Sequence, residues 1–98
     1  MPALNRIAAW HAQMTDWRRH LHRHPELALD CHETAAFVAG KLREFGVEEV
    51  HEGIARTGIV ALIRGGAPGP VIGLRADMDA LPMTEETGAP HASTIPGR

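Results

Sequence analysis

The sequence predicts an α/β fold in which two helices pack on a small mixed or antiparallel three-stranded sheet. Two segments with a helical apolar period come first in the chain of 98 residues, and three short apolar runs separated by turns follow them. Apolar residues three to four apart are typical of one helix face, whereas short runs bounded by Gly and Pro are typical of strands. The last stretch, residues 83–98, carries neither pattern and is expected to be a loop.

The first helix is expected over Asn5 to His24. Its apolar face is formed by residues at alternating spacings of three and four, namely Ile7, Trp10, Met14, Trp17 and Leu21. Asn5 is a suitable N-terminal cap, and Pro25 ends the helix because proline disfavours helical backbone in the residue before it. Both tryptophans are predicted to be anchors in the core.

The second helix is expected over Asp30 to Phe45. Asp30 and Glu33 form a capping-box-like pair, which typically stabilises a helix N-terminus by about 1 kcal/mol. Gly46 follows as a left-handed C-terminal stop. The predicted buried face consists of Ala35, Val38, Leu42 and Phe45.

Three strands are expected over Val47–Glu52, Ile59–Arg64 and Val71–Ala76. The first alternates apolar and polar residues and is expected at an edge, whereas the second is continuously apolar and is expected at the centre. The glycine and proline cluster of residues 65–70 favours an antiparallel hairpin between the second and third strands.

Composition excludes several classes of function. The net charge is only −2, with 22% charged residues of both signs, so no nucleic-acid surface is indicated. The apolar runs are too short to cross a bilayer, and the N-terminus lacks a signal-peptide pattern. A single cysteine, Cys31, cannot form an internal disulfide and is compatible with the cytoplasm, which is the expected location.

Two aspartates, Asp77 and Asp79, follow the third expected strand. On an extended backbone their side chains point to the same side, about 7 Å apart. Two negative charges at that distance repel by about 2 kcal/mol at an effective dielectric constant of about 20. A cation, an arginine or a proton would relieve that repulsion. One interpretation is a metal-facing pair; the other is a solvated loop in which Arg75 pairs with either aspartate.

Three histidines, His20, His22 and His24, cluster near the end of the first expected helix. His20 and His24 share a helix face, and with Glu26 nearby they could bind a metal. Their position also suits an exposed helix end, where cationic side chains interact favourably with the helix dipole. A small His-rich metal- or protein-binding module is therefore the alternative function.

Four motifs, taken together, identify a known family. They are Trp-Arg-Arg-His-Leu-His-Arg-His-Pro-Glu-Leu at 17–27, Thr-Gly-Ile-Val-Ala at 57–61, Gly-Leu-Arg-Ala-Asp-Met-Asp-Ala-Leu-Pro at 73–82, and Glu85-Glu86 with Pro-His-Ala-Ser at 90–93. Their order resembles the amidohydrolase branch of the M20 peptidase family, which includes hippurate hydrolases and N-acyl-amino-acid amidohydrolases. The resemblance implies that residues 1–98 are an N-terminal fragment of a catalytic domain of the zinc-exopeptidase-like type.

The resemblance implies a metal-dependent amidase that cleaves N-acyl amino acids to a carboxylate and an amino acid. In the family, two divalent ions (Zn, Mn, Co or Ni) polarise the amide carbonyl and activate water, and a glutamate takes the proton. The branch's Cys-Gly-His-Asp ligand motif is absent and is expected to follow Arg98. The 98-residue chain is therefore expected to bind no metal and to be inactive. Two further possibilities stay open, namely a homo-oligomer of the full-length protein and a second chain that supplies the missing motif.

The resemblance also assigns the two aspartates as candidate catalytic residues. Asp79 is expected to hydrogen-bond a metal ligand and to set its orientation and basicity. Asp77 stands where many M20 peptidases place a metal-binding histidine, and its expected partner is Arg75. The sequence His24-Pro25-Glu26 belongs to the family signature and is expected to have a structural role beside the site.

Overall fold

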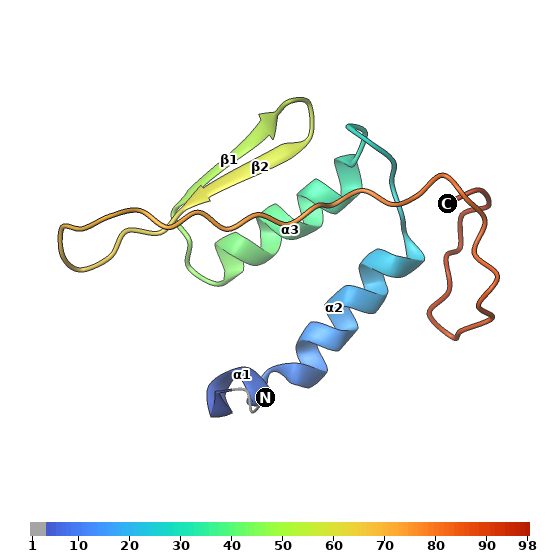
Figure 1. The fold of residues 1–98 in the computed structure, drawn as a ribbon, viewed down its shortest axis with the longest axis horizontal. Coiled ribbons are helices and arrows are strands. Elements are labelled where there is room, and N and C mark those ends of the chain that lie inside the picture. The colour runs from blue at the N-terminus through green and yellow to red at the C-terminus, as the bar shows by residue number, and fades with distance from the viewer. Residues whose placement is uncertain (1–3) are drawn as a thin grey trace. The chain divides into compact units, whose positions relative to one another are not determined.

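The computed structural model describes residues 4–98 and confirms the α/β class (Figure 1). The described residues form two compact units. The first contains the chain up to Pro25 together with Pro82–Arg98, and the second is Glu26–Leu81. The helices are α1 (Asn5–Ala9), α2 (His11–Arg23) and α3 (His32–Glu44), and the strands are β1 (Glu49–Ile54) and β2 (Gly58–Leu62).

A break at Trp10 divides the first expected helix into α1 and α2. The Trp10 N–H donates to the Ile7 carbonyl at 3.0 Å, and the Trp10 carbonyl accepts from the Met14 N–H at 3.0 Å. With φ −92° and ψ 0°, Trp10 leaves the helical backbone between these two bonds. Its side chain is 49% exposed, so the prediction of a core anchor is wrong for Trp10, whereas Trp17 is half-buried.

The two ends of this helical segment differ in how well they were predicted. Asn5 is not the cap, because it is already helical and Leu4 precedes it without a side-chain hydrogen bond. The predicted end at His24 is confirmed to within one residue: α2 ends at Arg23, and His24 has φ −122° and ψ 61°, outside the helical region, as the following Pro25 favours.

Residues 83–98 contain no helix or strand and are attached to the end of α2. The Arg23 carbonyl accepts two hydrogen bonds from Thr94, at 2.9 Å from its N–H and at 2.8 Å from its hydroxyl. These bonds occupy one of the carbonyl groups that every helix leaves without an intrahelical partner at its C-terminus.

In the second unit, α3 packs against an antiparallel hairpin formed by β1 and β2. The register pairs Glu49 with Leu62 and Ile54 with Gly58, with an irregularity between His51 and Ile54. Gly58 is required at this point, because a Cβ atom there would lie 2.5 Å from the Ile54 carbonyl oxygen. β1 and β2 start close to the first and second predicted strands, but the predicted hairpin between the second and third strands is wrong, because β1 and β2 pair with each other.

The third predicted strand is not present: residues 71–76 run without strand pairing. Val71 is 90%, Ile72 85% and Leu74 96% exposed. A strand exists only when a neighbouring strand accepts its backbone hydrogen bonds, and a short apolar run does not identify that neighbour. Further along the chain, Ala80 forms a single strand-type contact, which is a parallel bridge with Leu27.

The buried side chains of the second unit gather at the N-terminal half of α3, and they are Cys31, Thr34, Ala35, Ala39 and Thr57. The predicted face is confirmed at Ala35, while Val38 and Leu42 are half-buried. Phe45 is 57% exposed, so the prediction is wrong there. None of the helices within residues 4–98 combines the length and the apolarity that crossing a membrane demands.

Replacing the buried Thr57 by valine is expected to destabilise the second unit by about 2 kcal/mol. Its hydroxyl accepts from the Cys31 N–H at 3.1 Å and donates to the Leu29 carbonyl at 2.7 Å, and valine leaves both backbone groups unpaired. Urea denaturation measures the change. The exposed hydroxyl of Thr94 provides the control: Thr94→Val should cost about 0.5 kcal/mol or less. Equal effects of the two substitutions would contradict this account.

Candidate functional site

The first turn of α3 is capped by Glu26, a residue outside the helix. The Glu26 carboxylate accepts from the Thr34 N–H at 2.6 Å and from the Glu33 N–H at 3.1 Å. Partial burial opposes ionisation of Glu26, but the hydrogen bonds from Thr34 and Glu33 outweigh it and lower its pKa. A structural role was expected for His24-Pro25-Glu26, and the Glu26 carboxylate performs one by pairing two N–H groups that the helix cannot satisfy itself.

The predicted capping box of Asp30 with Glu33 is wrong, because Glu26 already occupies the N–H groups of the first turn. Cys31 is the cap residue and makes no side-chain cap bond. The Asp30 carboxylate instead lies 3.5 Å from the Arg56 guanidinium and 3.7 Å from the His32 ring. These are exposed ion pairs, which typically contribute about 0–1 kcal/mol.

The two aspartates proposed from the sequence have different surroundings. The Arg75 guanidinium lies 2.9 Å from the Asp77 carboxylate, and the two side chains are 89% and 71% exposed. Asp79 is followed by Ala80, whose N–H donates to the Glu26 carbonyl at 2.8 Å. Asp77 therefore lies in a solvated ion pair, whereas the backbone beside Asp79 is tied to the residue that caps α3.

The pKa of the Cys31 thiol is affected by its burial and by the negative charges around the α3 N-terminus. Cys31 is 2% exposed, and its Sγ lies 3.3 Å from the Ala28 carbonyl. Burial raises the pKa of this thiol most, and the negative charges of Glu26, Asp79 and Asp30 raise it further.

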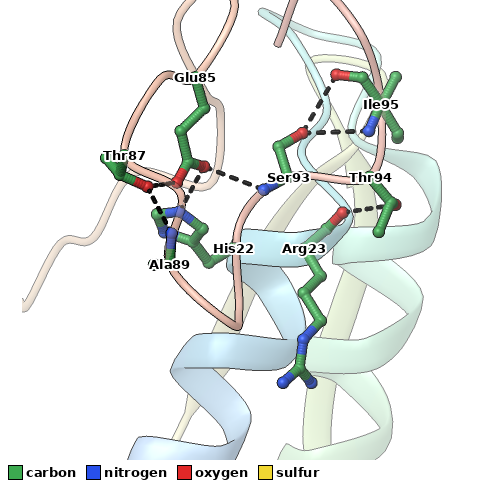
Figure 2. Close-up of polar contacts among 8 residues, drawn as sticks. All are labelled: His22, Arg23, Glu85, Thr87, Ala89, Ser93, Thr94 and Ile95. Carbon is green, nitrogen blue, oxygen red and sulfur yellow. Dashed lines mark hydrogen bonds and ion pairs between the residues drawn. The ribbon is translucent and has the colours of Figure 1, made fainter.

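A second cluster lies in the first unit, between the end of α2 and the loop of residues 83–98 (Figure 2). His22 Nε2 lies 2.7 Å from the Glu85 carboxylate, which also accepts hydrogen bonds from the Ser93 N–H at 2.9 Å and from the Thr87 hydroxyl. The Thr87 hydroxyl, the Ser93 N–H and His22 together lower the Glu85 pKa to about 2, against a smaller effect of burial. In the sequence Glu85 was recognisable only as part of the Glu85-Glu86 motif, because 63 positions separate it from His22.

The three clustered histidines do not form one group. The rings of His20 and His24 meet edge to face at 4.9 Å, as expected for positions four apart on a helix, while His22 meets the His91 ring at 5.2 Å. Burial, together with the positive charges of Arg19, His22 and other basic residues of α2, lowers the His91 pKa.

Nowhere in residues 4–98 do three or more His, Cys, Asp or Glu side chains come together in an arrangement that could hold a metal ion. The described residues therefore do not fit a complete metal site.

The Glu85 cluster predicts an acid transition of the loop. Because the folded pKa of about 2 lies below the ordinary value of 4.5, ionised Glu85 stabilises the loop fully above pH 4.5, and the contribution is lost as the pH falls through about 2. Side-chain ¹³C NMR should give a Glu85 midpoint near 2, with faster amide exchange at Ser93 below it. Glu85→Gln should remove this acid step; a Glu85 midpoint near 4.5 would contradict the cluster.

No protein-family model matches the chain. The N-acyl-L-amino acid amidohydrolase of Geobacillus stearothermophilus is 47% identical over 81 residues, covering 83% of this chain and 22% of that protein. The hippurate hydrolase of Campylobacter jejuni is 50% identical over 76 residues, covering 78% and 20%.

One solved structure extends the likeness to the fold. The Bacillus subtilis YXEP protein, described as a dinuclear metal-binding peptidase of the M20 family, matches with a TM-score of 0.84 and 41% identity, over 92% of this chain and 25% of that one. The chain spans about a fifth of the length of the curated relatives it matches. The predicted resemblance is confirmed: in sequence and in fold, this chain matches a segment of the amidohydrolases of the M20 peptidase family.

Proposed function

We propose that this chain is part of the catalytic domain of a metal-dependent amidohydrolase that cleaves N-acyl amino acids, hippurate-like substrates included, to a carboxylate and an amino acid. The observation that carries the proposal is the joint match of sequence and fold to a dinuclear metal-binding M20 peptidase, at 41% identity and a TM-score of 0.84. Relatives named for amide hydrolysis, at 47% and 50% identity, support the same reaction class.

Within this proposal Asp79 and Asp77 are the candidate catalytic residues. Asp79 hydrogen-bonds a metal ligand supplied from outside the described residues, and its carboxylate holds that ligand in orientation. Asp77 has the smaller role, because it lies in an exposed pair with Arg75. Two divalent ions (Zn, Mn, Co or Ni), when bound, would polarise the amide carbonyl and activate water.

The proposal extends to the organisation of the protein. Residues 1–98 are the N-terminal portion of the catalytic domain, and the family's Cys-Gly-His-Asp ligand motif does not occur in them. The 98-residue chain is therefore inactive by itself. A cytoplasmic location agrees with the single cysteine, and a homo-oligomer is the proposed state of the full-length protein.

A chimeric enzyme tests the proposed function. Residues of this chain replace the matching segment of the Geobacillus stearothermophilus amidohydrolase, and hydrolysis of N-acetyl and N-benzoyl amino acids is measured with Zn, Mn, Co or Ni. We expect metal-dependent turnover by the chimera and only background from the 98-residue chain. A chimera that folds and binds metal without turnover would refute the proposal, and metal-dependent turnover by the short chain would refute its inactivity.

The two aspartates are expected to differ in the same chimera. Asp79→Asn should lower activity or metal affinity by about 10- to 100-fold, because it weakens a hydrogen bond to a metal ligand. Asp77→Asn should cost about fivefold at most, the equivalent of an exposed ion pair of about 1 kcal/mol. Rates are compared at saturating and at limiting metal. A dead Asp77→Asn beside an unaffected Asp79→Asn would reverse the assignment.

A further inference from the structure

We propose that Glu26 is a positioning residue for Asp79: it fixes the first turn of α3 with its carboxylate and holds the backbone beside Asp79 with its own carbonyl. The inference rests on the proposed catalytic role of Asp79. It gives the Glu of the His-Pro-Glu motif a task beyond the capping of α3.

The side chain of Glu26 is held by the first turn of α3. Its two carboxylate oxygens accept separate N–H groups, one from Thr34 at 2.6 Å and one from Glu33 at 3.1 Å. Two bonds from consecutive residues of one helical turn leave the carboxylate little rotational freedom. Because hydrogen bonds to an ionised acceptor are about twice as strong as neutral ones, residue 26 is fastened to α3.

The backbone carbonyl of Glu26 binds the chain beside Asp79. The Glu26 carbonyl accepts from the Ala80 N–H at 2.8 Å, and Leu27 and Ala80 form a parallel bridge. Residues 71–79 are in no strand, so this bridge is the strand-type contact nearest to Asp79. Asp79 is therefore one peptide unit from a backbone hydrogen bond whose acceptor is anchored on α3.

Asp79 directly precedes Ala80, whose N–H donates to Glu26, the residue that caps the α3 N-terminus. The charge of Asp79 acts on the Cys31 thiol, which directly precedes His32 at the start of α3. Negative charge is favoured at a helix N-terminus, where N–H groups point outward. Since Cys31 is the chain's single cysteine, its titration reports how closely Asp79 is held.

A double-mutant cycle on the 98-residue chain tests the positioning, with the Cys31 pKa read from thiolate absorbance. Asp79→Asn should lower that pKa in the otherwise unchanged chain, and the effect should fall at least about twofold in the Glu26→Ala background. Asp30→Asn is the matched control, because Asp30 directly precedes Cys31 in the sequence and the peptide bond keeps the two residues adjacent. Its effect should be the same in both backgrounds. An undiminished effect of Asp79→Asn would overturn the proposal.

Two further variants keep the test decisive if Glu26→Ala does not fold. Ala80→Pro removes the N–H that donates to Glu26 and leaves the α3 cap untouched, so it should weaken the Asp79 effect in the same way. Glu26→Gln keeps one side-chain acceptor and should restore part of the effect. The Ala80 amide should also exchange slowly with solvent in the unchanged chain. Rapid exchange, or a full Asp79 effect in Ala80→Pro, would overturn the proposal.

Kinetics of the chimera separate this inference from the proposed function. Glu26→Gln should lower kcat by about 10-fold with KM unchanged, because misplacing a catalytic group slows the chemical step. Glu48→Gln removes an exposed carboxylate and should change neither constant. An active chimera indifferent to Glu26→Gln refutes the positioning alone. An inactive chimera refutes the function, while the Cys31 cycle still decides whether Glu26 holds Asp79.

Discussion

The second unit depends on how the N-terminus of α3 is satisfied. The first four N–H groups of every α-helix have no intrahelical partner, and burying them unpaired costs free energy. Here the Glu26 carboxylate takes two N–H groups, and the Thr57 hydroxyl takes that of Cys31 while donating to the Leu29 carbonyl. Both acceptors come from outside the helix, so capping α3 joins three separate stretches of the chain.

The same arrangement gives a physical reason for the family motifs. Thr57 is buried because its hydroxyl pairs two backbone groups, and Gly58 follows because the Ile54 carbonyl leaves no room for a side chain. Glu26 closes the His-Pro-Glu motif as the α3 cap and accepts the Ala80 N–H. Three motifs distant in sequence are therefore parts of one hydrogen-bonded junction, next to the aspartate proposed to be catalytic.

The sequence predicted the elements whose signals are local. The apolar period, Pro25 and the short apolar runs indicated the end of α2, and both ends of α3, β1 and β2, to within about two residues. Features that depend on partners distant in sequence were not predictable. The cap of α3 comes from Glu26 and not from the nearer Asp30, and the apolar run at 71–74 has no strand beside it. The spacing of the histidines likewise gave no sign that His22 pairs with Glu85.

Cys31 has a consequence for the redox behaviour of the chain. The thiolate is the form that attacks disulfides, reacts with oxidants and binds soft metals. Burial and the neighbouring carboxylates raise the pKa of this thiol, so the reactive form is scarce near neutral pH. The cysteine of this chain is thereby kept as a small, unreactive side chain in the core, first by its burial and then by the negative charges around the α3 N-terminus.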